Sequence, residues 1–286
     1  MATVIVTLAL VAAAVFFFWK EKPPQALQAL VGVKAADLTK IEIVSGGKSL
    51  ILENAGSWRL SSPIQDEAET SSAEEFADSL LSLSIGSAVS RDAASFSDYG
   101  LDEAHAARLR VYAKKSAAPI LDVWFGKSAL GSSCYWRRDR EATVYLAEGL
   151  RPYLLNRPVD DWRSRALMPF SLDELQALHM EKPRAFSVTK SSGSWAAPGL
   201  SADKASELVL AVSALRFTSF AADAPDKKTG FNKPSFVVSA SGKGMSEKIL
   251  LGKEDGPSRW AKVEGRKTLG LISKSAADSL LKLLKP

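Results

Sequence analysis

The hydrophobic pattern divides the chain into one continuous apolar run and a long remainder in which apolar and polar residues alternate. Every position from 2 to 19 except two threonines is apolar, and the first charge is Lys20. An α-helix rises about 1.5 Å per residue, so this run is long enough to cross a hydrocarbon core of about 30 Å. We therefore predict a transmembrane anchor over residues 1–22. The anchor residues are Val4, Ile5, Leu8, Leu10, Val11, Val15, Phe16, Phe17, Phe18 and Trp19.

Two other interpretations of this run are weaker. A cleaved signal peptide needs a basic start and a small-x-small cleavage site. No basic side chain precedes the run, and cleavage after Ala12–Ala14 would leave a new end that begins with five apolar residues. A buried core helix is the other alternative, but a helix that is apolar on all sides is hard to bury at the end of a small protein.

The charges beside the run leave the topology open. Lys20 and Lys22 follow it, and the positive-inside rule would place the domain behind them in the cytoplasm. Two charges are a weak bias, however. Pro23-Pro24 stiffens the exit from the membrane, and we assign residues 23–36 to a juxtamembrane linker.

After the linker, the same landmarks occur twice in the same order. Gly56-Ser57-Trp58 recurs as Gly193-Ser194-Trp195, each time after a strand-like run. The other pairs are Ser72-Ala73-Glu74 with Ser201-Ala202-Asp203, Tyr99-Gly100-Leu101 with Thr229-Gly230-Phe231, Gly126-Lys127 with Gly252-Lys253, Trp136 with Trp260, and Thr143 with Thr268. Such order indicates a duplication. We predict two tandem homologous domains, residues 37–165 and 166–286.

Each copy mixes short strands with two helices. Alternating residues predict strands in the first copy at 41–43, 50–53, 58–60, 109–113, 121–125, 135–137 and 143–146. Ser72 and Glu75 form a predicted capping box, followed by a helical stripe of Phe76, Ala77, Leu80 and Leu83, and a short helix closes the copy at 150–154. Helices at 205–212 and 277–284 repeat this order. We predict an α+β fold of mainly antiparallel sheets covered by helices.

Composition places the remainder among folded proteins. The 286 residues are 46% hydrophobic and 24% charged, which is normal for a globular chain. The single Cys134 excludes an intramolecular disulfide framework and a multi-cysteine metal site. The net charge of +5 is dispersed and indicates a solvated basic surface, with contact to anionic lipid as the alternative.

Searches for catalytic motifs find little. Gly46-Gly47-Lys48-Ser49 resembles the end of a phosphate-binding loop, but Glu42 stands where the leading glycine should be, and the segment joins two strands. A hairpin turn is the favoured interpretation. His105 and His179 are far apart and lack the close partners of a zinc site.

The remaining candidates also favour structural roles. Arg137 and Arg138 would lower the pKa of a nearby Cys134 thiol, but an inert strand-edge thiol is the simpler expectation. Asp102-Glu103 and Asp160-Asp161 are interpreted as solvated surface. The recurring tryptophans, at positions 58, 136, 195 and 260, are expected in the core rather than on a nucleic-acid stacking face. The sequence therefore predicts no catalytic, cofactor or metal residues and no nucleic-acid partner.

With these landmarks, the chain resembles the bacterial family of unknown function called DUF4340 over nearly its whole length. The landmarks that carry the resemblance are the two Gly-Ser-Trp triplets, the Ser-Ala-Asp/Glu helix starts, Tyr99-Gly100-Leu101, Phe125-Gly126-Lys127, Leu251-Gly252-Lys253 and Trp162-Arg163-Ser164-Arg165. The resemblance implies a single-pass protein whose repeated domain lies outside the cytoplasmic membrane, often encoded beside an ABC-2-type transporter and a gliding-motility-like component. The chain departs from the family habit because no basic residue precedes its anchor.

We therefore expect a non-catalytic accessory subunit of an ABC-type export or envelope machine, anchored in the inner membrane with its domains in the periplasm. It would bind a partner protein or an envelope polymer. A tethered enzyme acting on envelope lipid or glycan and a structural spacer are the alternatives. A cleft with paired carboxylates or His105 would favour the enzyme, whereas a groove lined by apolar and backbone groups would favour binding.

Overall fold

A computed structural model describes most of the chain beyond the N-terminal segment. The described residues are 25–26, 30, 32–130, 133–150, 152–168, 171–221, 224–242, 244–266 and 268–284. The predicted anchor at residues 1–22 lies outside them, as does part of the predicted linker. None of the helices in the described ranges has the length and apolar character that a membrane span requires. The chain folds as two compact units, Met1–Arg163 and Ser164–Pro286.

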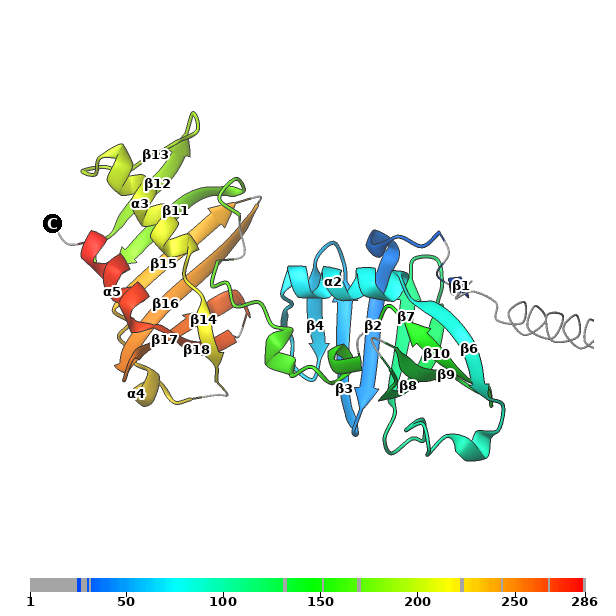
Figure 1. Cartoon of the computed structure of the whole chain (residues 1–286). Helices are drawn as coiled ribbons and strands as arrows, with labels where there is room; N and C mark the ends of the chain where they lie inside the picture. Colours follow the sequence, from blue (N-terminus) through cyan, green and yellow to red (C-terminus); the bar gives the residue numbers. More distant parts are fainter. Residues whose placement is uncertain are drawn as a thin grey trace, which may run out of the picture. The chain divides into compact units, whose positions relative to one another are not determined.

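The first unit is built on one ten-stranded sheet, in the order β1-β6-β10-β9-β8-β7-β2-β3-β4-β5 (Figure 1). The strands are β1 (Gln25–Ala26), β2 (Leu38–Ser45), β3 (Lys48–Asn54), β4 (Trp58–Ser62), β5 (Asp66–Glu67), β6 (Ser84–Ser90), β7 (Ala107–Ala113), β8 (Leu121–Ser128), β9 (Cys134–Arg138) and β10 (Val144–Glu148). The helices are α2 (Thr70–Leu81) and the 3-10 turns η2 (Ala35–Asp37), η3 (Ala93–Ser95), η4 (Pro152–Asn156) and η5 (Val159–Asp161). Every named strand pair in this sheet is antiparallel.

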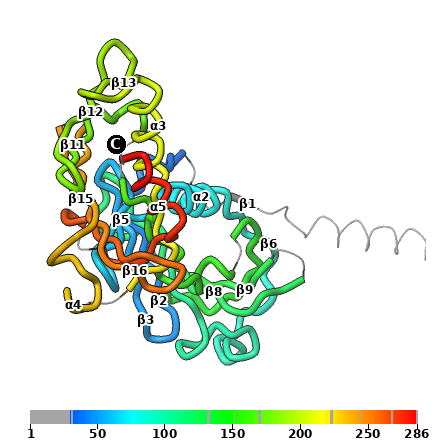
Figure 2. The backbone as a smooth tube through the Cα atoms, turned by 90° about the vertical axis from the view of Figure 1, so that its left-hand side faces the viewer, coloured from blue at the N-terminus to red at the C-terminus, as the bar shows by residue number. Residues whose placement is uncertain are grey.

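The second unit is built on an eight-stranded antiparallel sheet, in the order β13-β12-β11-β15-β16-β17-β18-β14. Its strands are β11 (Leu175–Lys182), β12 (Phe186–Ser191), β13 (Ser194–Ala196), β14 (Phe217–Phe220), β15 (Phe236–Gly242), β16 (Met245–Asp255), β17 (Ser258–Val263) and β18 (Thr268–Ser273). Its helices are α3 (Ala202–Ser213), α4 (Asp226–Thr229), η6 (Glu264–Arg266) and α5 (Lys274–Leu283). The α3 and α5 helices pack against each other over the same face of this sheet (Figures 1 and 2).

The two sheets share one strand order. In the first unit, β6-β10-β9-β8-β7-β2-β3-β4 occupy consecutive places, and β14-β18-β17-β16-β15-β11-β12-β13 occupy the same places in the second. Each strand in the first series comes at the same point of its unit's chain order as its counterpart in the second. The first unit adds the short β1 and β5 at its two edges.

The alternation in the sequence explains the main strands and helices. Along β7, every second residue from Ala107 to Ala113 is buried, as expected for a strand with one face on a core. Helix α2 buries Ala73, Phe76 and Leu80 on a single stripe. The predicted fold of mainly antiparallel sheets with a few helices is confirmed.

The predicted start of α2 was wrong. The helix begins at Thr70 rather than at Ser72, and its N-cap residue Glu69 makes no side-chain capping hydrogen bond. The Glu69 backbone N–H donates to the Trp162 carbonyl oxygen at 2.8 Å, and the Ala73 N–H donates to the Glu69 carbonyl oxygen at 3.0 Å. These contacts fix the first turn ahead of the predicted capping box. In α3 the prediction is confirmed, because the Ser201 hydroxyl accepts from the Lys204 N–H.

Each unit has its own hydrophobic core. Trp58 and Trp136 are buried in the first, and Trp260 is buried and Trp195 partly buried in the second, so the predicted structural role of these tryptophans is confirmed. A smaller cluster around Leu101 and Trp124 covers part of the first sheet under the loop that follows η3.

Candidate functional site

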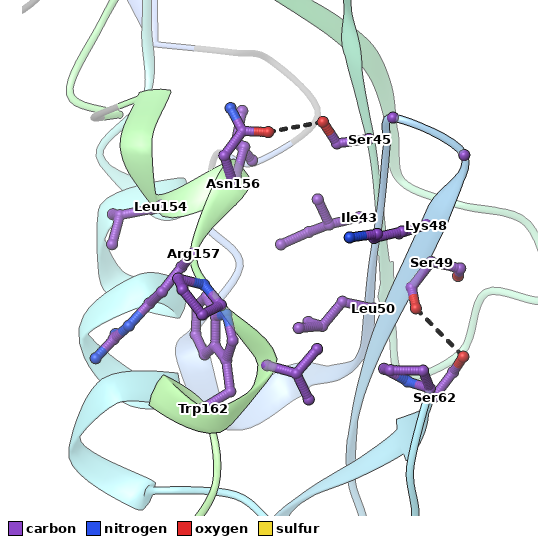
Figure 3. Close-up of a pocket in the computed structure, with 16 residues that line it drawn as sticks. Ile43, Ser45, Lys48, Ser49, Leu50, Ser62, Leu154, Asn156, Arg157 and Trp162 are labelled. Atoms are coloured by element: carbon purple, nitrogen blue, oxygen red, sulfur yellow. Dashed lines mark hydrogen bonds between the residues drawn. The ribbon is translucent and has the colours of Figure 1, made fainter.

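The first unit contains a cavity of about 880 Å³ between the β2–β3 hairpin and the segment that carries η4 and η5 (Figure 3). Its apolar lining consists of Ile43, Leu50, Leu154, Leu155, Val159 and Trp162, together with Pro63 and Pro158. Its polar lining consists of Ser45, Lys48, Ser49, Ser62, Asn156 and Arg157, with Gly46 and Gly47 at the hairpin turn. Cavities of this size and apolar character are typical of ligand sites in proteins.

The hairpin wall follows from local sequence. Gly46 and Gly47 have φ values of +55° and +72°, which glycine adopts without strain, and they form the two-residue turn that the sequence predicts. The strands on either side place Ile43 opposite Leu50 in the ladder, and both side chains are buried against the cavity. The motif that resembles a phosphate-binding loop is therefore a hairpin turn, as expected.

The opposite wall is formed by short 3-10 turns. Leu154 and Leu155 in η4 are buried, and Trp162 after η5 is 1% exposed. The Trp162 ring makes an edge-on contact with Phe76 of α2 at a centroid distance of 5.2 Å, and the Arg157 guanidinium lies 5.0 Å from the same ring. Because its surface is occupied in this way, Trp162 packs as part of the wall and offers no open face for stacking.

Two hydrogen bonds join polar groups of the cavity lining to each other. The Ser45 hydroxyl donates to Asn156 Oδ1 at 2.7 Å and so joins the two walls, and the Ser62 hydroxyl donates to the Ser49 carbonyl oxygen at 3.3 Å (Figure 3). Lys48 is exposed at the rim, and among the described residues no ion pair involves its ammonium group. No Asp or Glu belongs to the lining. The cavity therefore presents apolar walls and a cation at its rim.

A smaller hollow of about 540 Å³ adjoins the cavity and shares the η4–η5 segment with it. Glu75 of α2 and Asp161 of η5 line this hollow, and both side chains are exposed. Neither side chain has the burial that is typical of a catalytic acid. Within the described ranges, no cluster of three or more His, Cys, Asp or Glu side chains has the geometry to hold a metal ion.

The two histidines lie in different units and neither lines the cavity. The His105 ring is exposed, with Nδ1 2.7 Å from Asp102 Oδ1, and this hydrogen bond is the main cause that lowers the pKa of Asp102. His179 Nδ1 lies 3.0 Å from the Ser187 hydroxyl on the neighbouring strand. Both contacts are local and support the surface role that the sequence predicts.

The structure corrects the predicted sheet-edge position of Cys134. It lies in β9, which is paired on both sides, so it is not at a sheet edge, and it is fully buried. Burial raises the pKa of its thiol to about 12. The suggestion that nearby arginines lower this pKa was wrong, because desolvation of the thiolate dominates.

The neighbouring aromatic and basic residues are also structural. Successive residues of a strand face opposite sides of the sheet, so Trp136 enters the core whereas Arg137 lies on the other face. There the Arg137 guanidinium lies between the Phe96 ring, at 4.5 Å, and the Trp124 ring, at 4.8 Å, and burial lowers its pKa. This cation–π stack is closed and leaves no stacking platform for bases.

More than half of the chain matches the sequence model of a known protein family. The sequence model of the family described as "Domain of unknown function (DUF4340)" matches residues 58–234. The chain belongs to this family. The predicted family is thus confirmed, over a range that begins at β4 and ends before β15. No curated protein and no solved structure matches the chain.

The site predicted from the sequence and the cavity seen in the structure do not overlap. The predicted anchor residues, Val4, Ile5, Leu8, Leu10, Val11, Val15, Phe16, Phe17, Phe18 and Trp19, all lie outside the described residues. No local sequence pattern predicts the cavity lining as a group, because residues that meet there, such as Ser45 and Asn156, are 111 positions apart. The Gly46–Ser49 motif was the one signal at this place, and it was correctly interpreted as a turn.

Proposed function

We propose that this protein is a membrane-anchored, non-catalytic binding subunit that serves an ABC-type export or envelope machine from the extracytoplasmic side of the inner membrane. The observation that carries the binding role is the cavity of the first unit, whose lining is mainly apolar and contains no carboxylate. A binding site needs complementary surface, whereas acid–base catalysis needs placed titratable groups.

The two units are proposed to be tandem copies of one domain. The shared order of eight strands supports this, and so does a matching contact in each copy. In the first unit Gly100 has a φ of +66° and lies against Lys127, whose ammonium donates to the Asp98 carbonyl oxygen at 2.9 Å. In the second unit Gly230 has a φ of +78° and lies against Lys253, whose ammonium donates to the Lys227 carbonyl oxygen at 3.0 Å.

The location rests on the sequence and on the family resemblance. The apolar run from Ala2 to Trp19 is long enough for a membrane span, and the family resemblance implies that the domain lies outside the cytoplasmic membrane near ABC-2-type components. Protease treatment of intact spheroplasts tests the side directly. Digestion of the domain by added protease is expected, and full protection would place it in the cytoplasm.

Co-purification tests the accessory role. The full-length chain is tagged at its C-terminus and extracted in a mild detergent, and an unrelated single-pass protein with the same tag serves as the control. We expect a transporter subunit to be recovered with this chain and not with the control. Recovery of the chain as a lone monomer, with no transporter subunit, would count against the proposed role.

A further inference from the structure

We propose that the cavity between the β2–β3 hairpin and the η4–η5 segment binds a single-chain fatty-acid carboxylate. The acyl chain would lie against the apolar walls, and the carboxylate would pair with the Lys48 ammonium at the rim. This inference deepens the proposed binding function and rests on it, because it names the class of ligand that the first unit takes.

The walls fit an acyl chain in size and chemistry. The volume of about 880 Å³ lies within the range of small-molecule sites. Ile43 and Leu50 of the hairpin face the cavity (Figure 3), and Leu154, Leu155 and Val159 of the opposite segment belong to its lining. A methylene chain gains free energy by leaving water for such a lining and needs no hydrogen-bond partner there.

A peptide strand and a sugar fit the same place less well. Both β2 and β3 are interior strands, paired on each side, so their backbone groups are not free to add another strand. A sugar ring needs a free aromatic face and several open polar groups. Trp162 is almost fully buried, and the Ser45 hydroxyl is already hydrogen-bonded to Asn156.

The charge at the rim selects the head group. Lys48 follows the hairpin turn and its side chain points toward the cavity (Figure 3), while Arg157 turns away and lies over the Trp162 ring. No carboxylate of the lining competes for the Lys48 ammonium. An anionic group held at the rim would therefore gain a charge-assisted hydrogen bond without displacing an existing ion pair.

Photolabelling of the full-length chain tests this proposal. A dodecanoate that carries a diazirine near its far end is added to a detergent-free lysate of cells that express the chain, irradiated, and mapped by peptide mass spectrometry. We expect adducts on the peptides that contain Ile43–Leu50 and Leu154–Trp162. Unlabelled fatty acids should compete, with about fourfold gain in potency for each methylene from octanoate to dodecanoate.

A matched pair of lysine variants tests the contribution of the contact between Lys48 and the fatty-acid carboxylate to binding. Lys48→Gln should weaken competition by dodecanoate about three- to tenfold and leave competition by dodecan-1-ol unchanged. Lys114→Gln alters an exposed lysine that does not line the cavity, and it should change neither.

Two results would overturn the proposal. Absence from the two peptides of adducts that unlabelled dodecanoate competes away would refute the assignment of the cavity, and equal competition in Lys48→Gln and the unaltered chain would refute the carboxylate. Either result leaves the accessory role intact if the transporter subunit still co-purifies. Failure of the fatty-acid proposal can therefore be distinguished from failure of the proposed function.

Discussion

Gly126 is the position where the structure predicts the sharpest effect of adding a single methyl group. It lies in β8, and a Cβ atom there would come 2.2 Å from the Tyr99 carbonyl oxygen and 2.9 Å from the Gly100 carbonyl oxygen. Both neighbours are backbone atoms and cannot turn aside. The loop would have to move, which would also stretch the hydrogen bond from the Lys127 N–H to the Tyr99 carbonyl oxygen, now 2.9 Å.

These contacts set the size of the effect. Overpacking a tight site costs roughly 1–3 kcal/mol, and the loss of one hydrogen bond adds about 1 kcal/mol. We therefore expect Gly126→Ala to lower the free energy of unfolding of the first unit by about 2–4 kcal/mol. For a unit of this size, that corresponds to a fall of about 5–15 °C in the melting temperature.

Hydrogen exchange followed by mass spectrometry measures the effect in each unit separately. Gly126→Ala should speed exchange across β7 and β8 and leave the second unit unchanged. Gly252→Ala should do the converse, because its Cβ would come 2.0 Å from the Thr229 carbonyl oxygen. Gly46→Ala is the control for backbone strain alone, since its φ is +55° and no atom lies within 4 Å of the added Cβ. If Gly126→Ala were no more destabilising than Gly46→Ala, the close approach would be refuted.

Three further predictions concern buried and charged groups. Cys134, with its pKa raised to about 12, should react with a thiol reagent at pH 8 only as fast as the first unit unfolds, and rapid reaction of the native chain would contradict its burial. The indole N–H of Trp124 donates to the Asp139 carboxylate, and this hydrogen bond is the main cause of the lowered pKa of Asp139. The ionised Asp139 carboxylate therefore stabilises the fold above pH 3.8, and this stabilisation is lost as the pH falls further. Asp139→Asn should therefore flatten the decline of the urea midpoint below pH 3.8, and an unchanged slope would argue against this hydrogen bond. Asp66→Asn should cost about 2 kcal/mol in urea unfolding, because the Arg163 guanidinium, 2.8 Å away, would lose its buried carboxylate partner and keep the exposed Asp160, at 3.1 Å; a cost under about 1 kcal/mol would contradict that pairing.

Among the strands that the sequence predicts, β7 carries the clearest pattern. Its alternation is strict, because the strand packs one side on a core. Strand β6 escaped prediction because none of its residues is fully buried and its sequence is rich in Ser, Gly and Ala. Strand β14 is short and lies at the edge of its sheet, so its pattern also carries little information.

The cavity could not be predicted from the sequence, for a different reason. Its two walls come from the β2–β3 hairpin and from η4–η5, and no local pattern couples segments so far apart. The 3-10 turn at Pro152–Asn156 stands where a short helix was predicted, since the apolar spacing of Leu150 and Leu154 suits either. Tertiary contacts decide how this turn packs against the β2–β3 hairpin and therefore how large the cavity between them is.

The most direct test of the central claim, that this chain acts by binding within a membrane machine, is cross-linking in intact cells. The full-length chain is cross-linked through its lysines, enriched and analysed by mass spectrometry. We predict cross-links to an integral subunit of an ABC-type transporter. Cross-links confined to the chain itself, together with migration as a 30.7 kDa monomer, would contradict the account.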